Sequence, residues 1–264
     1  DDGSTDGSVA EIRKIQDDRI RFVQMPSNSG LPAVPRNRGL ALARGEYIAF
    51  LDADDRWLDE KMQKQVEFMR KWPEFLLTHT SCYVVDSTGK RKGIRHQGSV
   101  PPSGEYFREL LKHCWICLST VMLHRDLMEE IGLFNESPDY MTGEDWEYFW
   151  RSARRHPIGF LEEPLAEYRK HEDNICKIGW NWRGTPRDYL TLNRFRHRCD
   201  LWADAISLVE MRDAIWDTAQ ENAIFWRRQH EFGKAAWFVW QMIRLSPFSL
   251  RSWKQGLAVG LRRR

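Results

Sequence analysis

Hydrophobic and polar positions in the first two thirds of the chain form short blocks that predict alternating strands and helices. A run at 46–50, apolar after Glu46, predicts a buried strand. Residues 75–85, rich in β-branched and aromatic side chains, predict another. Between them, four apolar residues recur at helical spacing: Met62, Val66, Met69 and Trp72. This order predicts an α/β fold with a mostly parallel sheet and flanking crossover helices.

Local signals predict the other elements of this part. They are a helix from Asp6 or Ser8 to Ile15, a strand at 19–25, a helix at 37–44, a hairpin turn at 86–90, a strand at 119–124, helices at 126–131 and 144–155, and a strand at 165–168. Pro35 fits only near the start of the helix that follows it. From the hairpin turn to Gly104 the chain is basic, proline-bearing and irregular, which is typical of a loop at the rim of a site.

The last part of the chain has a different pattern, with long helical stretches crowded with Trp and Arg. Two helices are predicted there, with apolar faces at 236–243 and 250–261. The last one carries basic residues, including the arginines at 262–264, and would suit an anionic membrane surface; plain packing and a short helical-repeat appendage are the alternatives. We therefore divide the chain into a domain at 1–173 and a helical extension at 174–264.

Composition mainly excludes classes of function. The 264 residues carry 40 basic and 38 acidic side chains, a net charge of +2, so no overall field points to nucleic acid. Five irregularly spaced cysteines indicate a reducing compartment, and the CxxC pair Cys114 and Cys117 lacks the second pair that zinc needs. No apolar run could span a bilayer and no signal peptide is visible, so we expect a cytoplasmic protein, with peripheral contact on the inner membrane surface left open.

The strongest chemical signal is a group of three aspartates, Asp52, Asp54 and Asp55, that follows the predicted strand at 46–50. An open α/β sheet binds its ligand at the carboxyl ends of its strands. Carboxylates packed this closely repel one another, and a divalent cation that itself bridges to phosphate relieves the repulsion. The sequence therefore predicts a site for a metal ion and a diphosphate.

A second pair of carboxylates, Glu144 and Asp145, falls in the first turn of the predicted helix at 144–155, after Thr142 or Gly143 as the cap. The helix dipole alone favours acidic residues at this place. A general base could be held in the same way, hydrogen-bonded and ionised at a helix start. Spacing alone leaves both interpretations open.

Four motifs in sequence make the first part of the chain resemble a family 2 inverting glycosyltransferase of the GT-A fold. They are DDGSTDGS at 1–8, NSGLP at 28–32 with RNRG at 36–39, GEYIAFLDADD at 45–55, and GEDW at 143–146. The resemblance covers residues 1–173 and implies a Rossmann-like sheet with flanking helices. This family has a strand, a helix and a second strand before the first motif, so we expect a fragment that lacks its first strands.

The resemblance also implies which residues bind the donor. Asp1 or Asp2 would read the nucleotide base, with Arg36 and Asn37 near the base and the phosphates. Asp52, the first residue of the DXD signature, would lie near the ribose and the metal. The donor would be a UDP-, GDP- or dTDP-sugar.

The resemblance further implies a metal site and a catalytic base. Asp54, the second residue of the DXD signature, would ligate Mn²⁺ or Mg²⁺ together with Asp52. His171 would reach the diphosphate or the metal, although a solvent-facing histidine is an equal alternative. Asp145 would take the proton from the acceptor hydroxyl as it attacks the anomeric carbon, and Glu144 would tune that base or contact the acceptor.

The expected function is therefore transfer of a sugar to a glycan or lipid-linked acceptor, in the synthesis of a cell-surface polysaccharide or lipopolysaccharide. Two alternatives come from other classes of protein. One is an inactive fragment that binds carbohydrate or nucleotide. The other is a sugar-phosphate nucleotidyltransferase, which would need a glycine-rich, basic phosphate loop that the sequence lacks.

Overall fold

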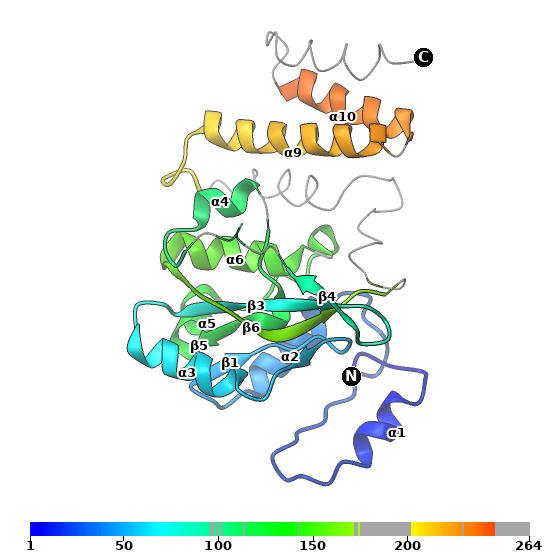
Figure 1. Ribbon diagram of the computed structural model, residues 1–264, viewed down its shortest axis with the longest axis vertical. Coiled ribbons are helices and arrows are strands. Elements are labelled where there is room, and N and C mark those ends of the chain that lie inside the picture. Colours follow the sequence, from blue (N-terminus) through cyan, green and yellow to red (C-terminus); the bar gives the residue numbers. More distant parts are fainter. Residues whose placement is uncertain are drawn as a thin grey trace.

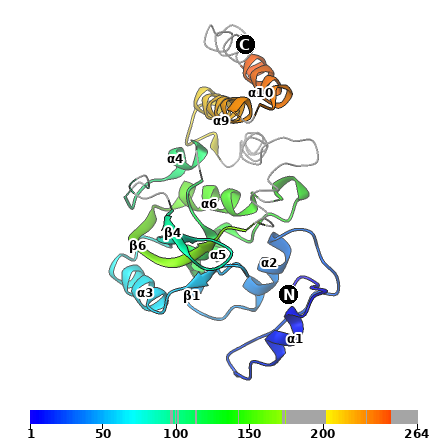
Figure 2. The same cartoon turned by 45° about the vertical axis from the view of Figure 1, so that its right-hand side comes forward.

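A computed structural model describes residues 1–95, 98, 100, 102–112, 114–141, 143–171, 174, 202–228 and 230–245. An α/β body holds the sheet, and a helical hairpin lies at one end of the long axis (Figure 1). The first helix, α1 (Ser8–Arg13), lies at the opposite end (Figure 1). A turned view keeps helix α6 between the sheet and the hairpin (Figure 2).

One sheet of six strands forms the centre of the body. The strands are β1 (Tyr47–Ala49), β2 (Arg56–Trp57), β3 (Leu77–Val85), β4 (Arg91–Ile94), β5 (Met122–His124) and β6 (Ile158–Arg169). Their order is β1-β5-β3-β6-β2, and β4 pairs with β3 through the predicted hairpin turn. The α/β fold class with flanking helices is thus confirmed.

The expectation of a mostly parallel sheet is wrong for the described residues. Only the β3–β6 pairing is parallel, while β1–β5, β3–β5, β3–β4 and β2–β6 are antiparallel. The reason is that β5 lies between β1 and β3 and is antiparallel to both, so β1 and β3 do not pair with each other although they run in the same direction. The sheet is therefore mixed.

The mixed sheet still brings three strand ends together. Because β5 is antiparallel to both β1 and β3, those two strands run in the same direction, and β6 runs parallel to β3. The carboxyl ends of β1, β3 and β6 therefore lie along the same edge of the sheet, where α/β proteins bind their ligands.

Helices pack around this sheet. They are α2 (Ala33–Leu42), α3 (Lys61–Lys71), α4 (Phe107–Lys112), α5 (Arg125–Ile131) and α6 (Glu144–Arg155). Helix α6 has the predicted bounds, with Gly143 as its cap; Thr142 lies outside the described residues. Trp146 and Trp150 of α6 are buried, and Trp146 Nε1 donates to the backbone oxygen of Leu110 at 2.7 Å.

Helix α3 forms where predicted, but its buried face matches the predicted one only at Met69. Lys61, Gln65 and Met69 are buried, whereas Met62 is 41% exposed and Trp72 is 43% exposed. Gln65 Nε2 donates to the backbone oxygens of Thr78 and Thr120 at 3.2 and 3.0 Å. Hydrogen bonds to the sheet therefore set the rotation of this helix, which apolar spacing alone did not reveal.

The predicted strand at 19–25 is not a strand in the structure. Its backbone bonds to the first residue instead: the amino group of Asp1 donates to Val23 O at 2.8 Å, and Met25 N donates to Asp1 O at 2.9 Å. The next helix, α2, begins at Ala33 rather than at 37. Pro35 then falls in its first turn, the part of a helix that tolerates proline.

The helical hairpin consists of α9 (Leu208–Arg228) and α10 (Phe232–Leu245). Helix α10 buries Ala235, Phe238, Val239 and Met242. Of the predicted apolar face at 236–243, Val239 is therefore buried, whereas Trp240 is 52% exposed. The hairpin shares one hydrophobic cluster with the body and is tied to α4 by Arg108 Nε, which donates to Glu210 Oε1 at 3.1 Å. The predicted helix at 250–261 and the arginines at 262–264 lie outside the described residues.

Candidate active site

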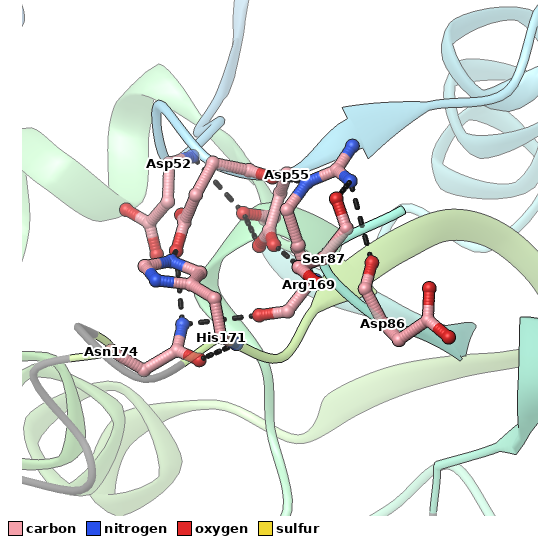
Figure 3. A network of polar contacts seen from close by, with 9 residues as sticks. Asp52, Asp55, Asp86, Ser87, Arg169, His171 and Asn174 are labelled. Carbon is pink, nitrogen blue, oxygen red and sulfur yellow. Dashed lines mark hydrogen bonds and ion pairs between the residues drawn. The ribbon is translucent and has the colours of Figure 1, made fainter. Parts of the chain in front are cut away.

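Three chain segments meet where β1, β3 and β6 end (Figure 3). The first is the acidic loop, Asp52–Asp55, which connects β1 to β2. The second is the hairpin turn at 86–90 after β3, and the third follows Arg169, the last residue of β6. The predicted site at a strand end is thus a place where segments distant in sequence come together.

Asp55 anchors the acidic loop to its neighbours. Ser119 Oγ donates to Asp55 Oδ2 at 2.6 Å, and the backbone N–H of Arg169 donates to Asp55 Oδ1 at 2.9 Å. Burial raises the pKa of Asp55 to about 6, against the opposing effect of these hydrogen bonds. Both carboxylate oxygens of Asp55 accept hydrogen bonds from the protein itself, so this residue fixes the conformation of the acidic loop.

Asp54 contacts His171, so the structure brings two predicted metal ligands together. His171 Nε2 lies 3.0 Å from Asp54 Oδ2. Asn174 Nδ2 donates to the same oxygen at 3.0 Å. The Asp54 side chain is 36% exposed and that of His171 is 27% exposed, so both remain accessible from solvent.

Arg36 joins the acidic loop to α6. Its Nη2 donates to Asp52 Oδ1 at 2.9 Å, and its Nη1 forms a short contact with Glu144 Oε1. Burial raises the pKa of Asp52. The positive charge of Arg36 opposes this rise, and the negative charge of nearby Asp145 adds to it. One guanidinium thus separates two carboxylates that would otherwise repel each other at close range.

Asp145 lies within electrostatic reach of this pair. Burial tends to lower the pKa of Arg36, but the charges of Asp52, Glu144 and Asp145 outweigh it and raise that pKa. The Oδ1 atom of Asp145 accepts the N–H of Trp146 at 2.8 Å, which orients the carboxylate at the start of α6. The predicted base and the predicted donor site are therefore neighbours.

The structure places the remaining predicted donor residues in other contacts. Asn37 is buried and binds the loop after α5: its Nδ2 donates to Phe134 O at 2.9 Å, and its Oδ1 accepts Phe134 N–H at 2.9 Å. Asp1 Oδ2 accepts the N–H of Gly3 at 3.1 Å. Asp2 Oδ2 accepts the hydroxyl of Ser29 at 2.8 Å.

Asp1 also lines a cavity of about 520 Å³ between the segment at 19–25 and α2. Arg38 and Arg44 line the same cavity, and none of the aspartates of the acidic loop does. Asn37 thus supports the fold, and Asp1 and Asp2 have no described contact with the acidic loop. They are not part of the network that joins Arg36, Asp52 and Asp54.

The acidic loop offers ligands that suit a hard divalent cation. Among the described residues, no group of three or more His, Cys, Asp or Glu side chains is arranged to hold a metal. Asp54 and His171 nevertheless present one oxygen and one nitrogen to the same point. Mg²⁺ and similar ions commonly use one or two protein ligands and complete their shell with water and phosphate oxygens, so these residues fit a metal bound together with a diphosphate.

Sequence reasoning missed three polar residues of this network: Ser119, Arg169 and Asn174 (Figure 3 labels the last two). Ser119 and Asn174 carry no local motif, since their role depends on which strands are neighbours. Arg169 directly follows the strand predicted at 165–168, and a basic residue at a strand end was the one available signal.

Curated relatives with sequence similarity are bacterial glycosyltransferases. An uncharacterised glycosyltransferase of Rickettsia felis is 36% identical over 171 residues, which are 64% of this chain but only 27% of that protein. The putative teichuronic acid biosynthesis glycosyltransferase TuaG of Bacillus subtilis is 34% identical, over 68% of this chain and 69% of its own. The Escherichia coli UDP-Glc:alpha-D-GlcNAc-diphosphoundecaprenol beta-1,3-glucosyltransferase WfaP is 37% identical, over 66% and 65%.

Solved structures show the same fold. S. aureus TarS in complex with UDP-GlcNAc superposes with a TM-score of 0.60 and 14% identity, over 98% of this chain and 78% of that chain. The mannosyltransferase PcManGT from Pyrobaculum calidifontis, in complex with GDP-Man and Mn²⁺, superposes with a TM-score of 0.50 and 14% identity, over 99% and 70%. The family model described as glycosyl transferase family 2 matches residues 1–132, and the chain belongs to this family.

Proposed function

We propose that this glycosyltransferase moves a sugar from a nucleotide-diphosphate donor to an acceptor hydroxyl, with inversion at the anomeric carbon. The observation that carries the proposal is that two pairs of side chains, Asp54 with His171 and Arg36 with Asp52, meet at one sheet edge. Asp54 and His171 form the first pair, and Arg36 joins Asp52 to the start of α6, where Asp145 lies. A cation–diphosphate site and a base would thus lie side by side, as a direct displacement requires.

Asp54 and His171 would hold Mn²⁺ or Mg²⁺ against the donor's diphosphate. Their 3.0 Å contact and partial exposure support this role, because the two ligating atoms lie close enough together to bind one ion and solvent can reach both. A bound cation neutralises the charge that develops on the departing diphosphate. The mannosyltransferase of similar fold, in complex with GDP-Man and Mn²⁺, supports the choice of metal.

Arg36 and Asp52 would bind the donor beside the metal. Asp52 would lie near the ribose and the metal, and Arg36 near the phosphates. A guanidinium can donate two parallel hydrogen bonds to a phosphate, so Arg36 can serve the ligand while it keeps Asp52 and Glu144 apart.

Asp145 would act as the general base. It would accept the proton of the acceptor hydroxyl as that oxygen attacks the sugar from the side opposite the diphosphate. A single direct displacement inverts the anomeric centre and needs no protein nucleophile. Glu144 is held by Arg36 in the same helical turn, so it would orient this turn and tune the base.

The substrates are proposed from the relatives. UDP-, GDP- or dTDP-sugars are the donor candidates, and a glycan or lipid-linked acceptor agrees with the printed activity of the E. coli relative WfaP. Cell-surface polysaccharide or lipopolysaccharide synthesis is the proposed process, as for the teichuronic acid relative. Among the described residues no helix is both long and apolar enough to cross a bilayer. We propose that the protein is cytoplasmic and makes peripheral contact with the inner membrane surface.

A hydrolysis assay with a panel of nucleotide sugars and Mn²⁺ tests this function. Release of a nucleoside diphosphate supports the transferase. A second assay supplies a sugar phosphate and a nucleoside triphosphate, and release of pyrophosphate in it would support a nucleotidyltransferase instead. Donor binding without any release would indicate an inactive binding protein, and Asp145→Asn is the matched control for background hydrolysis.

A further inference from the structure

Arg169, the last residue of β6, contacts two segments of the site at once (Figure 3). Its Nε donates to the backbone oxygen of Asp54 at 2.9 Å, and its backbone N–H donates to Asp55 Oδ1 at 2.9 Å. Its Nη1 donates to the backbone oxygens of Asp86 and Ser87 at 3.4 and 3.3 Å. One half-buried side chain therefore fastens the acidic loop to the hairpin turn.

A second path leads from Arg169 to the carboxylate of Asp54. The backbone oxygen of Arg169 accepts Asn174 Nδ2 at 3.0 Å, and the same Nδ2 donates to Asp54 Oδ2 at 3.0 Å. Asn174 Oδ1 also accepts the N–H of His171 at 2.5 Å. The Arg169 guanidinium thus holds the main chain of Asp54 directly. The backbone oxygen of the same residue, which a substitution keeps, holds the Asp54 side chain through an amide that also fixes His171.

Only an arginine can make these side-chain contacts together. Its planar guanidinium directs donors along fixed, divergent lines, which here reach Asp54 on one side and the hairpin turn on the other. A lysine ammonium is a single point at the end of a flexible stem and cannot reach both segments. Without the guanidinium, the main chain of Asp54 would lose its link to the hairpin turn and would have to be ordered each time a cation binds, and that ordering weakens binding.

We propose that Arg169 is a positioning residue, which holds Asp54 at the cation site and couples the hairpin turn to it. The inference builds on the proposed metal site and adds a residue to it. Arg169 does not touch the cation or the reacting atoms. Its effect is therefore on the affinity for metal, and the chemical step is affected only through Asp54.

The test measures Mn²⁺ binding to the full chain by electron paramagnetic resonance, with Mn²⁺ alone as the probe. Arg169→Lys is compared with Arg91→Lys, a matched control on β4. Arg91 pairs with Glu167 at 2.9 Å, makes no described contact with the acidic loop, and leaves Glu167 a second partner in Arg56 when it is changed. Thermal unfolding of each variant shows what fraction is folded at the titration temperature.

We expect Arg169→Lys to weaken Mn²⁺ binding by about 10-fold or more, in the range seen when residues behind a metal ligand are changed, with Arg91→Lys close to wild type. Wild-type affinity in a folded Arg169→Lys would overturn the inference and leave the metal site standing. Failure of the wild type to bind Mn²⁺ would overturn both.

A second variant covers the case in which Arg169→Lys does not fold well. Arg169→Ala leaves space for a free guanidinium ion, which can replace the lost group without the tether. Recovery of Mn²⁺ affinity on adding guanidinium at a non-denaturing concentration supports positioning. Affinity that stays low, or that never fell, contradicts it.

Discussion

His171 Nε2 lies 3.0 Å from Asp54 Oδ2, although the two residues are 117 positions apart in the chain. The contact exists because the loop after β1 and the segment after β6 leave the sheet at the same edge. Both residues were predicted as metal ligands from the sequence, and their meeting gives that prediction a geometric basis.

Asp54→Asn should remove metal-dependent donor binding. The amide has the size of the carboxylate but lacks its charge, so the cation loses its main protein ligand. Because changes behind a metal ligand already cost about 10- to 100-fold, we expect at least about 100-fold weaker Mn²⁺ binding by calorimetry. Asp55→Asn is the comparison: both of its oxygens are used inside the protein, so it should lower stability more than metal affinity.

Arg36→Met should destabilise the protein in a pH-dependent way. It leaves Asp52 and the buried Glu144 without their shared cation, at a cost of about 3–5 kcal/mol near neutral pH. Burial raises the pKa of Asp52, and a carboxyl with a raised folded-state pKa regains stability as the pH falls below it. Urea unfolding at several pH values should show a deficit that shrinks toward acid pH. A deficit that grows in acid would contradict the ion-pair interpretation.

Lys61 gives a second pH signature, unrelated to the site. It is fully buried, and burial lowers its pKa from 10.5 to about 8, so between these values the unfolded chain binds more protons than the folded one. Stability should therefore rise with pH across this window, by about 3 kcal/mol for the full shift.

The measurement is the difference between wild type and Lys61→Met in urea unfolding at pH 7 and pH 10. Lys61→Met should lose the rise. Lys64→Met, one turn away and pairing with Glu60 and Glu163 in the wild type, should keep it, because the pKa of Lys64 is raised rather than lowered. An equal change in unfolding free energy between pH 7 and pH 10 for all three proteins would contradict the lowered pKa of folded Lys61.

Asn37→Ala tests the structural role of Asn37. It leaves the buried N–H of Phe134 without its acceptor and Phe134 O without its donor, at about 1–3 kcal/mol for each group. Thermal unfolding should show this loss, while donor affinity in the folded variant should match wild type within about twofold, since Asn37 has no described contact with the acidic loop. A selective loss of donor affinity would restore Asn37 to the donor site.

The sequence revealed those features that depend on neighbours along the chain. Helix α6 was predicted at its observed bounds because its acidic first turn and its aromatic spacing are local signals, and the acidic loop stood out as three carboxylates after an apolar run. The mixed sheet was missed because the insertion of β5 between β1 and β3 is a long-range pairing. Asn174 was missed for the same reason, since only the packed sheet edge brings it to Asp54.

The rotation of α3 shows another limit. Its apolar spacing suggested that Met62 faces the sheet, but Lys61 and Gln65 are buried instead, because the Gln65 amide bonds to carbonyls of two neighbouring segments. Buried polar residues that are fully hydrogen-bonded are invisible to hydrophobic periodicity. The segment at 19–25 has the alternation of a strand, yet a strand also needs a partner, and its described backbone partner is Asp1.

The central claim is that Asp145 is the base beside a cation–diphosphate site, and the most direct test compares wild type with Asp145→Asn. For a nucleotide sugar that the wild type cleaves, donor affinity with Mn²⁺ is measured by calorimetry and release of the nucleoside diphosphate by a coupled assay. The account predicts nearly unchanged donor affinity and a rate about 10²- to 10⁴-fold lower, the usual contribution of a general base. Cleavage by Asp145→Asn at the wild-type rate would contradict it.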